Sequence, residues 1–312
     1  MRKAALSLAI IGLALPLLAA APAQALSART WVSGAGDDAS PTCSRTAPCK
    51  TFQGAIFKTT AGGEINCLDA GDFGTVTIQF SLTIACEAGT AGVVTTGGGL
   101  FGIVISAATT DVVTLRGLDV DGQGIGNIGI YIQSAKAVHI EKCAIRNFRG
   151  SGSGRGVTTF SIAPFTVFLF VADTVISDNS YGLLFTNIGG FKVVSLKNVT
   201  ITGSTNDGLN LLSSDVYVNI TKSIISGNSG SAVKAAASST TVNIDRSTIA
   251  NNAVALNAAV TGSTIRISGN NIFNNTAGFT IAGGATIQTD NTNNTGGSNG
   301  GATVPNASLA KN

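Results

Sequence analysis

The best-placed pair of acidic residues in the sequence is Asp119 and Asp121, in the segment LDVDG. Every second side chain of a β-strand points to the same side, so these carboxylates would face outward about 7 Å apart. Such a pair could hold a cation or supply the acid and the base of glycoside hydrolysis. The ordinary alternative is a solvated strand end that runs into a glycine turn, and we favour it. We therefore assign no catalytic residue and keep Asp119 and Asp121 as the candidates to test.

The other residue types that carry chemistry do not form a set. The single histidine, His139, lies between two β-branched residues and would face outward, without an acid beside it in a recognisable constellation. One histidine and no Cys/His cluster support neither a Ser/His/Asp triad nor structural zinc. The segment GIGNIG at Gly124 matches a dinucleotide-binding pattern, but an alternating segment follows it where a helix is required. The sequence predicts no cofactor, and nothing else in it supports calcium.

A second set of residues could bind a ligand without reacting with it. Apolar residues recur along the chain at a spacing mostly in the twenties, and the residue after each should face outward. These outward positions mix both signs of charge, and the alternation also exposes two tyrosines. The predicted binding residues are Arg116, Glu141, Lys197, Asp245, Tyr131 and Tyr217. A flat face of this kind would suit a polysaccharide. The charges would suit pairing between neighbouring strands equally well, and we favour this pairing as the usual role of surface charge.

The positions of these residues depend on an internal repeat. The stretches VNITKSIISGN and VNIDRSTIANN, which begin at Val218 and Val242, share their apolar positions 24 residues apart. The central apolar residues of the series are Leu115, Ile140, Val171, Leu196, Ile220, Ile244 and Ile267. A second apolar residue follows each one, and asparagine recurs in one register at Asn179, Asn228, Asn252 and Asn275. Short alternating strands fill each unit and helical periodicity does not, so the repeat predicts a β-solenoid.

The repeat leads to one fold. Each unit is too small to bury its own apolar face, so it must stack on its neighbours with parallel strands about 4.8 Å apart. Crossovers between parallel strands are right-handed in almost all proteins, and the stacked asparagines would form a ladder. We therefore predict an all-β fold, a right-handed parallel β-helix solenoid of about nine coils. Phe52, Ala55 and Ile56 lie on one helical face and predict a short N-terminal cap helix.

The ends of the chain predict its organisation and destination. Arg2 and Lys3 precede an apolar run and a small-residue cleavage signal that ends at Ala25, as in a secretory signal peptide. We expect a signal peptide at 1–25, an N-terminal loop and cap helix at 26–64, the β-helix at 65–290 and a polar tail at 291–312. No later stretch is long and apolar enough to span a membrane. The protein is therefore predicted to be secreted or periplasmic, and we expect a monomer.

Charge and cysteine content add two further predictions. Without Arg2 and Lys3, 17 of the 19 Lys and Arg remain against 16 Asp and Glu, and no basic run is present, so nucleic acid is not a predicted partner. The five cysteines would meet an oxidising compartment after export. Proximity favours the disulfides Cys43–Cys49 and Cys67–Cys86, with Cys143 as a buried thiol, although other pairings stay open.

Two pairs of segments carry a resemblance to a known group of proteins. TWVSGAGDDASPTCSRTAPCKTFQGAI followed by GGEINCLDAGDFGTVTI resembles the N-terminal region of pectin-lyase-like β-helix proteins. LRGLDVDGQG and VHIEKCAIRNF resemble secreted bacterial right-handed β-helix repeat proteins. The resemblance covers nearly the whole mature chain and implies the fold. It does not imply one activity, because that superfamily contains lyases, hydrolases, epimerases, adhesins and proteins without enzymatic activity.

The catalytic patterns of that superfamily are incomplete in this sequence. Pectate-lyase-like sites use several carboxylates to hold calcium together with a basic residue, and galacturonase-like sites use three aspartates on neighbouring coils. STNDGLNL around Asp207 resembles only the first galacturonase-like segment, and the next coil, GNSGSAVKAA, lacks the aspartate pair. We therefore expect an exported, non-catalytic protein that binds a glycan or acts at the cell surface. The alternatives are a divergent polysaccharide lyase or glycoside hydrolase, and a structural or adhesive surface protein.

Overall fold

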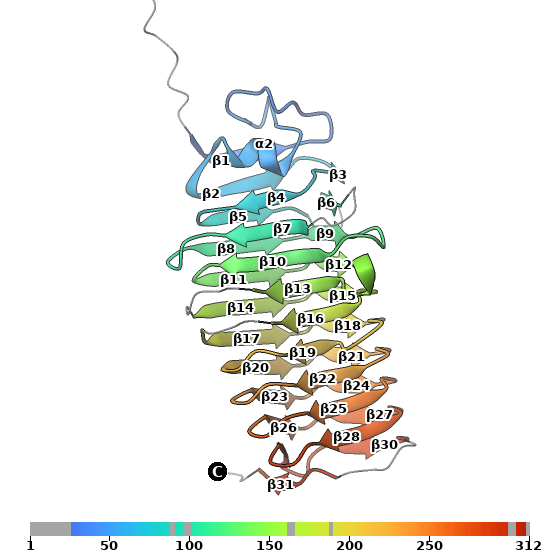
Figure 1. Cartoon of the computed structure of the whole chain (residues 1–312). Helices are drawn as coiled ribbons and strands as arrows, with labels where there is room; N and C mark the ends of the chain where they lie inside the picture. The colour runs from blue at the N-terminus through green and yellow to red at the C-terminus, as the bar shows by residue number, and fades with distance from the viewer. Residues whose placement is uncertain are drawn as a thin grey trace, which may run out of the picture.

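The computed structural model of the chain describes residues 26–87, 91–95, 101–160, 166–186, 190–298 and 304–309. Within these residues the strands wind into an elongated stack with three columns of parallel strands (Figure 1). We call these columns the first, second and third sheets, in the order in which each turn of the chain visits them. The predicted signal peptide, residues 1–25, lies outside the described residues.

The strands of each sheet are hydrogen-bonded in sequence order among the described residues. The first sheet contains β1 (Ser27–Val32), β2 (Thr59–Cys67), β5 (Leu82–Ala85), β8 (Val112–Arg116), β11 (Ala137–Glu141), β14 (Val167–Ala172), β17 (Lys192–Lys197), β20 (Val216–Thr221), β23 (Thr241–Asp245), β26 (Thr264–Ser268), β29 (Thr286–Thr289) and β31 (Ala307–Ser308). The second contains β3 (Gly71–Asp72), β6 (Ala91–Val94), β9 (Leu118–Asp121), β12 (Ala144–Arg146), β15 (Val175–Ser177), β18 (Thr200–Thr202), β21 (Ile224–Ser226), β24 (Thr248–Ala250), β27 (Asn271–Phe273) and β30 (Asn294–Gly296). The third contains β4 (Val76–Ile78), β7 (Phe101–Ser106), β10 (Ile128–Ser134), β13 (Arg155–Thr159), β16 (Tyr181–Phe185), β19 (Leu209–Leu211), β22 (Ser231–Ala235), β25 (Val254–Ala258) and β28 (Ala277–Ile281).

The register of the strands matches the repeat in the sequence. From β2 to β28 the chain visits the first, second and third sheets in turn, and the third sheet holds nine described strands, one for each of these turns. Strand β20 pairs in parallel with β23 so that Val218 lies beside Val242 and Ile220 beside Ile244. The fold is the right-handed parallel β-helix that the repeat predicts, and the repeated apolar residues form its core: Ile220 is fully buried and Ile244 is 1% exposed.

The predicted asparagine ladder lies in the turns between the second and third sheets. The backbone N–H of Ser204 donates to Asn228 Oδ1 at 3.0 Å, that of Asn228 to Asn252 Oδ1 at 3.1 Å, and that of Asn252 to Asn275 Oδ1 at 3.0 Å. Two turns before Ser204 in the stack, Phe148 N–H donates to Asn179 Oδ1 in the same way. In these turns the backbone N–H lacks a strand partner, and the amide oxygen of the asparagine in the next turn accepts its hydrogen bond instead.

A short helix covers the N-terminal end of the stack (Figure 1). Helix α2 (Phe52–Ile56) begins after Thr51, whose side chain accepts a hydrogen bond from Gly54 N–H and so caps the helix. Phe52 is fully buried and packs on Phe73, with ring centroids 5.3 Å apart. The buried face of α2 is the predicted one, and it shields the first turn of the solenoid from water.

The disulfides Cys43–Cys49 and Cys67–Cys86 are present as predicted, and Cys143 is a free, buried thiol.

The C-terminal segment differs from the expected tail. Strands β30 and β31 add to the second and first sheets, so the stack extends beyond residue 290. A 3-10 turn, η2 (Gly150–Gly152), lies in the insertion that lengthens one repeat. Among the described residues, no helix is long and apolar enough to cross a membrane.

Candidate functional site

The carboxylates of Asp119 and Asp121 lie on strand β9 and share one cation from the next turn. Asp119 accepts Arg146 Nε and Nη2 at 2.9 Å each, and Asp121 Oδ2 lies 2.7 Å from Arg146 Nη1. Strands β9 and β12 pair so that Asp121 and Arg146 are direct neighbours. The hydrogen bond to Asp119, followed by the charges of the nearby aspartates, raises the pKa of Arg146 further above its ordinary value against the opposing effect of burial.

The remaining contacts of Asp121 fill its other oxygen. Its Oδ1 accepts Gln123 N–H at 2.8 Å and Asn147 Nδ2 at 3.1 Å, and its side chain is only 7% exposed. The alternation alone indicates that both carboxylates project freely into water. The structure shows instead that Asp121 is nearly buried and that both are bound by Arg146. Arg146 pairs with both carboxylates, and Asn147 binds one oxygen of Asp121. Within the described part of the chain, no group of three or more His, Cys, Asp and Glu could hold a metal ion.

The charged residues predicted to bind a ligand lie in one column on the outer face of the first sheet. Strand pairing places Arg116 beside Glu141, and the column continues through Ala172, Lys197, Thr221 and Asp245. The described cross-turn neighbours in this column are not within ion-pair distance of one another. Asp245 instead pairs within its own turn, at 2.6 Å from Arg246 Nε. The column is the one that the spacing predicts, and cross-turn salt bridges do not account for it.

The same face carries an aromatic cluster, of which the sequence predicted only Tyr217 as a binding residue. His139 stacks on Phe170 with ring centroids 4.8 Å apart and planes inclined by 16°. One turn further on, Phe191 lies against Tyr217 at 5.1 Å. Phe168 lies two residues before Phe170 and points to the same side of β14. We call these five residues the aromatic face.

The four hydrophobic rings of the aromatic face are substantially exposed. Phe168 is 36% exposed, Phe170 37%, Phe191 40% and Tyr217 43%. They are held on the paired strands β14, β17 and β20, or directly beside them, so their positions are fixed by backbone hydrogen bonds. The signal that could have revealed Phe168 and Phe170 is the run VFLFV, in which every second residue is aromatic and alternates with a buried one.

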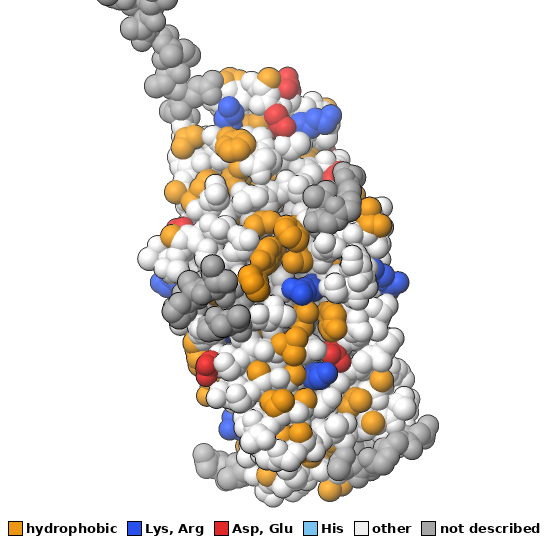
Figure 2. Space-filling model, viewed as in Figure 1, with side chains coloured by type: hydrophobic (Ala, Val, Ile, Leu, Met, Phe, Trp, Pro, Cys, Tyr) orange, Lys and Arg blue, Asp and Glu red, His pale blue; other side chains and the backbone are white. Residues whose placement is uncertain are grey.

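Tyr131, the other predicted aromatic ligand, lies on a different side of the molecule. It belongs to β10 of the third sheet and packs against Phe101, with ring centroids 5.2 Å apart. Figure 2 shows a cluster of hydrophobic side chains on this side, over β7 and β10. Tyr131 and Tyr217 therefore cannot contact one short ligand together, because they lie on different sheets.

Comparisons with known proteins agree with the architecture. No protein-family model matches the chain, and no curated protein sequence matches it. Among solved structures, that of pectate lyase Pel9A is similar with a TM-score of 0.70 and 16% identity, over 92% of this chain and 80% of the lyase. The chain has a pectin-lyase-like fold. A rhamnogalacturonan lyase is similar with a TM-score of 0.51 and 14% identity, over 79% of this chain and 74% of that one. At such identities the likeness shows the fold alone.

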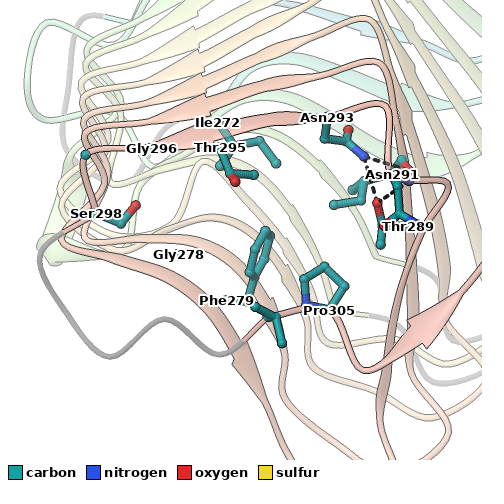
Figure 3. A pocket seen from close by; sticks show the side chains of 13 residues that line it. Ile272, Gly278, Phe279, Thr289, Asn291, Asn293, Thr295, Gly296, Ser298 and Pro305 are labelled. Atoms are coloured by element: carbon teal, nitrogen blue, oxygen red, sulfur yellow. Dashed lines mark hydrogen bonds between the residues drawn. The ribbon is translucent and has the colours of Figure 1, made fainter.

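This pectin-lyase-like β-helix also has a cavity of about 410 Å³ near its C-terminal end. Figure 3 shows Phe279 and Pro305 in this cavity, with Asn293 hydrogen-bonded to Thr289 on its rim. The floor is the core of the last turns, including Ile267 and Ile272, and none of the described lining residues is charged. We therefore interpret this cavity as the end of the solenoid interior, since it offers no group suited to acid–base chemistry.

Proposed function

We propose that the protein is an exported β-helix that binds a glycan on the outer face of its first sheet without cleaving it. The observation that carries this proposal is the aromatic face. Four large rings at 36–43% exposure lie close together on one face, and exposed apolar clusters on soluble proteins commonly mark interaction sites. Pyranose rings present flat C–H faces, which pack well on aromatic rings that are already held in place.

The direction of the face suits an extended chain. Successive strands of the first sheet are about 4.8 Å apart, an advance close to the length of one sugar ring along an extended polysaccharide. Phe168 and Phe170 lie on β14, Phe191 directly before β17 and Tyr217 on β20, so the four rings are distributed over three successive turns. The charged column from Glu141 to Asp245 runs parallel to them and offers polar partners along one side. A ligand that lies along the solenoid axis would contact both.

Export is supported by two independent features. The sequence begins with a predicted signal peptide at residues 1–25. The two disulfides near the N-terminal cap are of the kind that persist in oxidising compartments and are rare in the cytosol. Together they favour a periplasmic or secreted location, where polysaccharides of cell walls and capsules are accessible.

The absence of catalysis in this proposal rests on the contacts of the best carboxylate pair. Arg146 binds both Asp119 and Asp121. Asp121 is also nearly buried and accepts hydrogen bonds from Gln123 and Asn147. An acid or base must instead reach the substrate within hydrogen-bond distance. A divergent lyase or hydrolase is the alternative, and an adhesive protein that recognises other proteins is the second.

The test is a binding and turnover panel with immobilised and soluble polysaccharides. We expect the wild type to bind at least one of them and to release neither reducing nor unsaturated ends. The variant Phe170→Ala/Tyr217→Ala should lose binding, whereas Phe273→Ala should retain it, because Phe273 is equally exposed, at 39%, but lies on the second sheet.

Each other outcome overturns a part of the proposal. Turnover that disappears in Asp119→Asn/Asp121→Asn, at unchanged melting temperature, would identify an enzyme with this pair as its site. Turnover that survives the double change would place catalysis elsewhere in the molecule. No binding to any glycan would favour the adhesive alternative.

A further inference from the structure

The charges around the aromatic face are few and nearly balanced. Over the strands β11, β14, β17, β20 and β23 the charged outward side chains of the first sheet are Glu141, Lys197 and Asp245, counting His139 as neutral. The exposed charges in the turns on either side of these strands are Lys136, Lys142, Asp173, Asp215, Lys222 and Arg246. Five cations thus face four anions over the whole face and its edges.

These charges do not form a positively charged track. Lys197 is the only cation on the described strands from β11 to β23 that projects from the face itself, and Glu141 and Asp245 lie toward its two ends. A polyuronate carries one carboxylate on every sugar. Laid along five turns, it would bring several negative charges beside one lysine and two acidic side chains, and like charges at close range repel.

The aromatic rings make the same distinction. The faces of Phe and Tyr rings carry the negative part of the ring quadrupole, so they attract C–H groups and cations and repel anions. A carboxylate brought against Phe168, Phe170 and Tyr217 would also lose water without gaining a partner, which is costly. A hydroxymethyl group at the same position loses much less.

Uncharged polar groups continue the face beyond the rings. Ser195, Asn219 and Asn243 follow His139 and Phe170 in one column of paired residues. Asn243 Nδ2 donates to Asn219 Oδ1 at 2.8 Å, which orients both amides. It leaves Asn219 Nδ2 as a donor and Asn243 Oδ1 as an acceptor without a partner among the described residues. Sugar hydroxyls both donate and accept, so they match this pair.

We infer that the aromatic face selects a chain of uncharged sugars over a polyuronate. This inference rests on the proposed function, because it names the class of glycan bound at that same face. Its physical content is that contact with rings, amides and hydroxyls supplies the affinity, and that long-range attraction of charge contributes little.

The experiment compares soluble neutral chains (galactan, arabinan, xylan, mannan and a β-glucan) with polygalacturonate and alginate by affinity electrophoresis and titration calorimetry. We expect at least one neutral chain to bind more tightly than both polyuronates. Its Kd should change by less than about twofold between low salt and about 0.5 M NaCl, because screening acts on charge contacts. Tyr217→Ala should weaken that binding about three- to tenfold.

The charge-reversal variant Lys222→Glu separates the two classes of ligand. It lies in an exposed turn at the edge of the face, outside the aromatic face. We expect it to leave the Kd for the neutral chain within about twofold and to weaken any residual polyuronate binding. Tightest binding to a polyuronate, lost with salt or with Lys222→Glu, would overturn the inference and leave the proposed function standing. Failure of every chain to bind would instead overturn the proposed function.

Discussion

Replacing Asn252 with alanine tests whether the asparagine ladder holds neighbouring turns together. Asn252 Oδ1 accepts the backbone N–H and the side-chain Nδ2 of Asn228, at 3.1 and 2.9 Å. Its Nδ2 donates to Asn275 Oδ1 at 2.9 Å and to the carbonyls of Ile225 and Ala250 at 3.0 Å each. One side chain therefore connects three successive turns.

The expected cost follows from the groups that lose a partner. Asn252 is 2% exposed, so the groups around it have little water to turn to. The carbonyl of Ala250 keeps its backbone hydrogen bond from Gly227, whereas the N–H of Asn228 loses the acceptor that the structure gives it. An unsatisfied buried donor costs about 1–3 kcal/mol, and we expect a loss of that size. For a domain of this length, each kcal/mol lowers Tm by about 2–4 °C.

The assay is thermal and urea denaturation of the oxidised protein, with Ser229→Ala as the matched control. Ser229 lies in the same turn as Asn228 but is exposed, so its hydroxyl should be dispensable. We also expect Asn228→Ala/Asn252→Ala to be less destabilised than the sum of the single variants, because both remove the bond between the two amides. An Asn252→Ala variant that melts with the wild type and the control would refute the reasoning.

Two further predictions concern ionisable groups. Burial raises the pKa of Cys143 to about 11, partly offset by hydrogen bonds from neighbouring backbone, so the thiol should react slowly in the native protein near pH 8 and once per chain in urea. Rapid stoichiometric labelling of the native protein would contradict this. The pKa of Asp69 is lowered by hydrogen bonds from the Ser33 hydroxyl and then from Gly34 N–H, which link the segment after β1 to the first turn. Its stabilising contribution is therefore present above the unfolded pKa of about 3.9 and is lost as the pH falls through the lower folded value. Asp69→Asn should be less stable than the wild type at neutral pH and converge with it in acid, as followed by denaturation at a series of pH values.

The fold was predictable because stacking repeats the same environment in every turn. Ile220 and Ile244 occupy equivalent buried positions, so each imposes the same residue type and the register can be read as a spacing. The Cys43–Cys49 disulfide followed from the closeness of the two cysteines in one loop, and Cys67–Cys86 followed from two neighbouring strand ends; both pairings agree with the structure. The end of the stack was harder to place, since β30 consists of Asn294–Gly296 and lacks the apolar alternation that marks the other strands.

The site was predictable only where one column of the repeat sufficed. Arg116 and Glu141 were placed together because they follow equivalent apolar residues. The partner of Asp121 was missed although Arg146 lies one period later, because carboxylates were compared with one another rather than with the next turn. Tyr131 was grouped with Tyr217 because alternation tells inside from outside but not which of three sheets a strand joins.

The uniform joint between turns also governs how such a chain can change its length. Asn228, Asn252 and Asn275 make the same contacts at separations of 24 and 23 residues. After a deletion of residues 229–252, Asn275 would become the next member of the ladder after Asn228. Its Oδ1 could then accept the same hydrogen bond from the backbone N–H of Asn228. In-frame duplication or loss of one repeat can therefore leave the contacts between the remaining turns unchanged. Each such event lengthens or shortens the solenoid by about 4.8 Å, so the length of the outer face changes between variants only by whole turns.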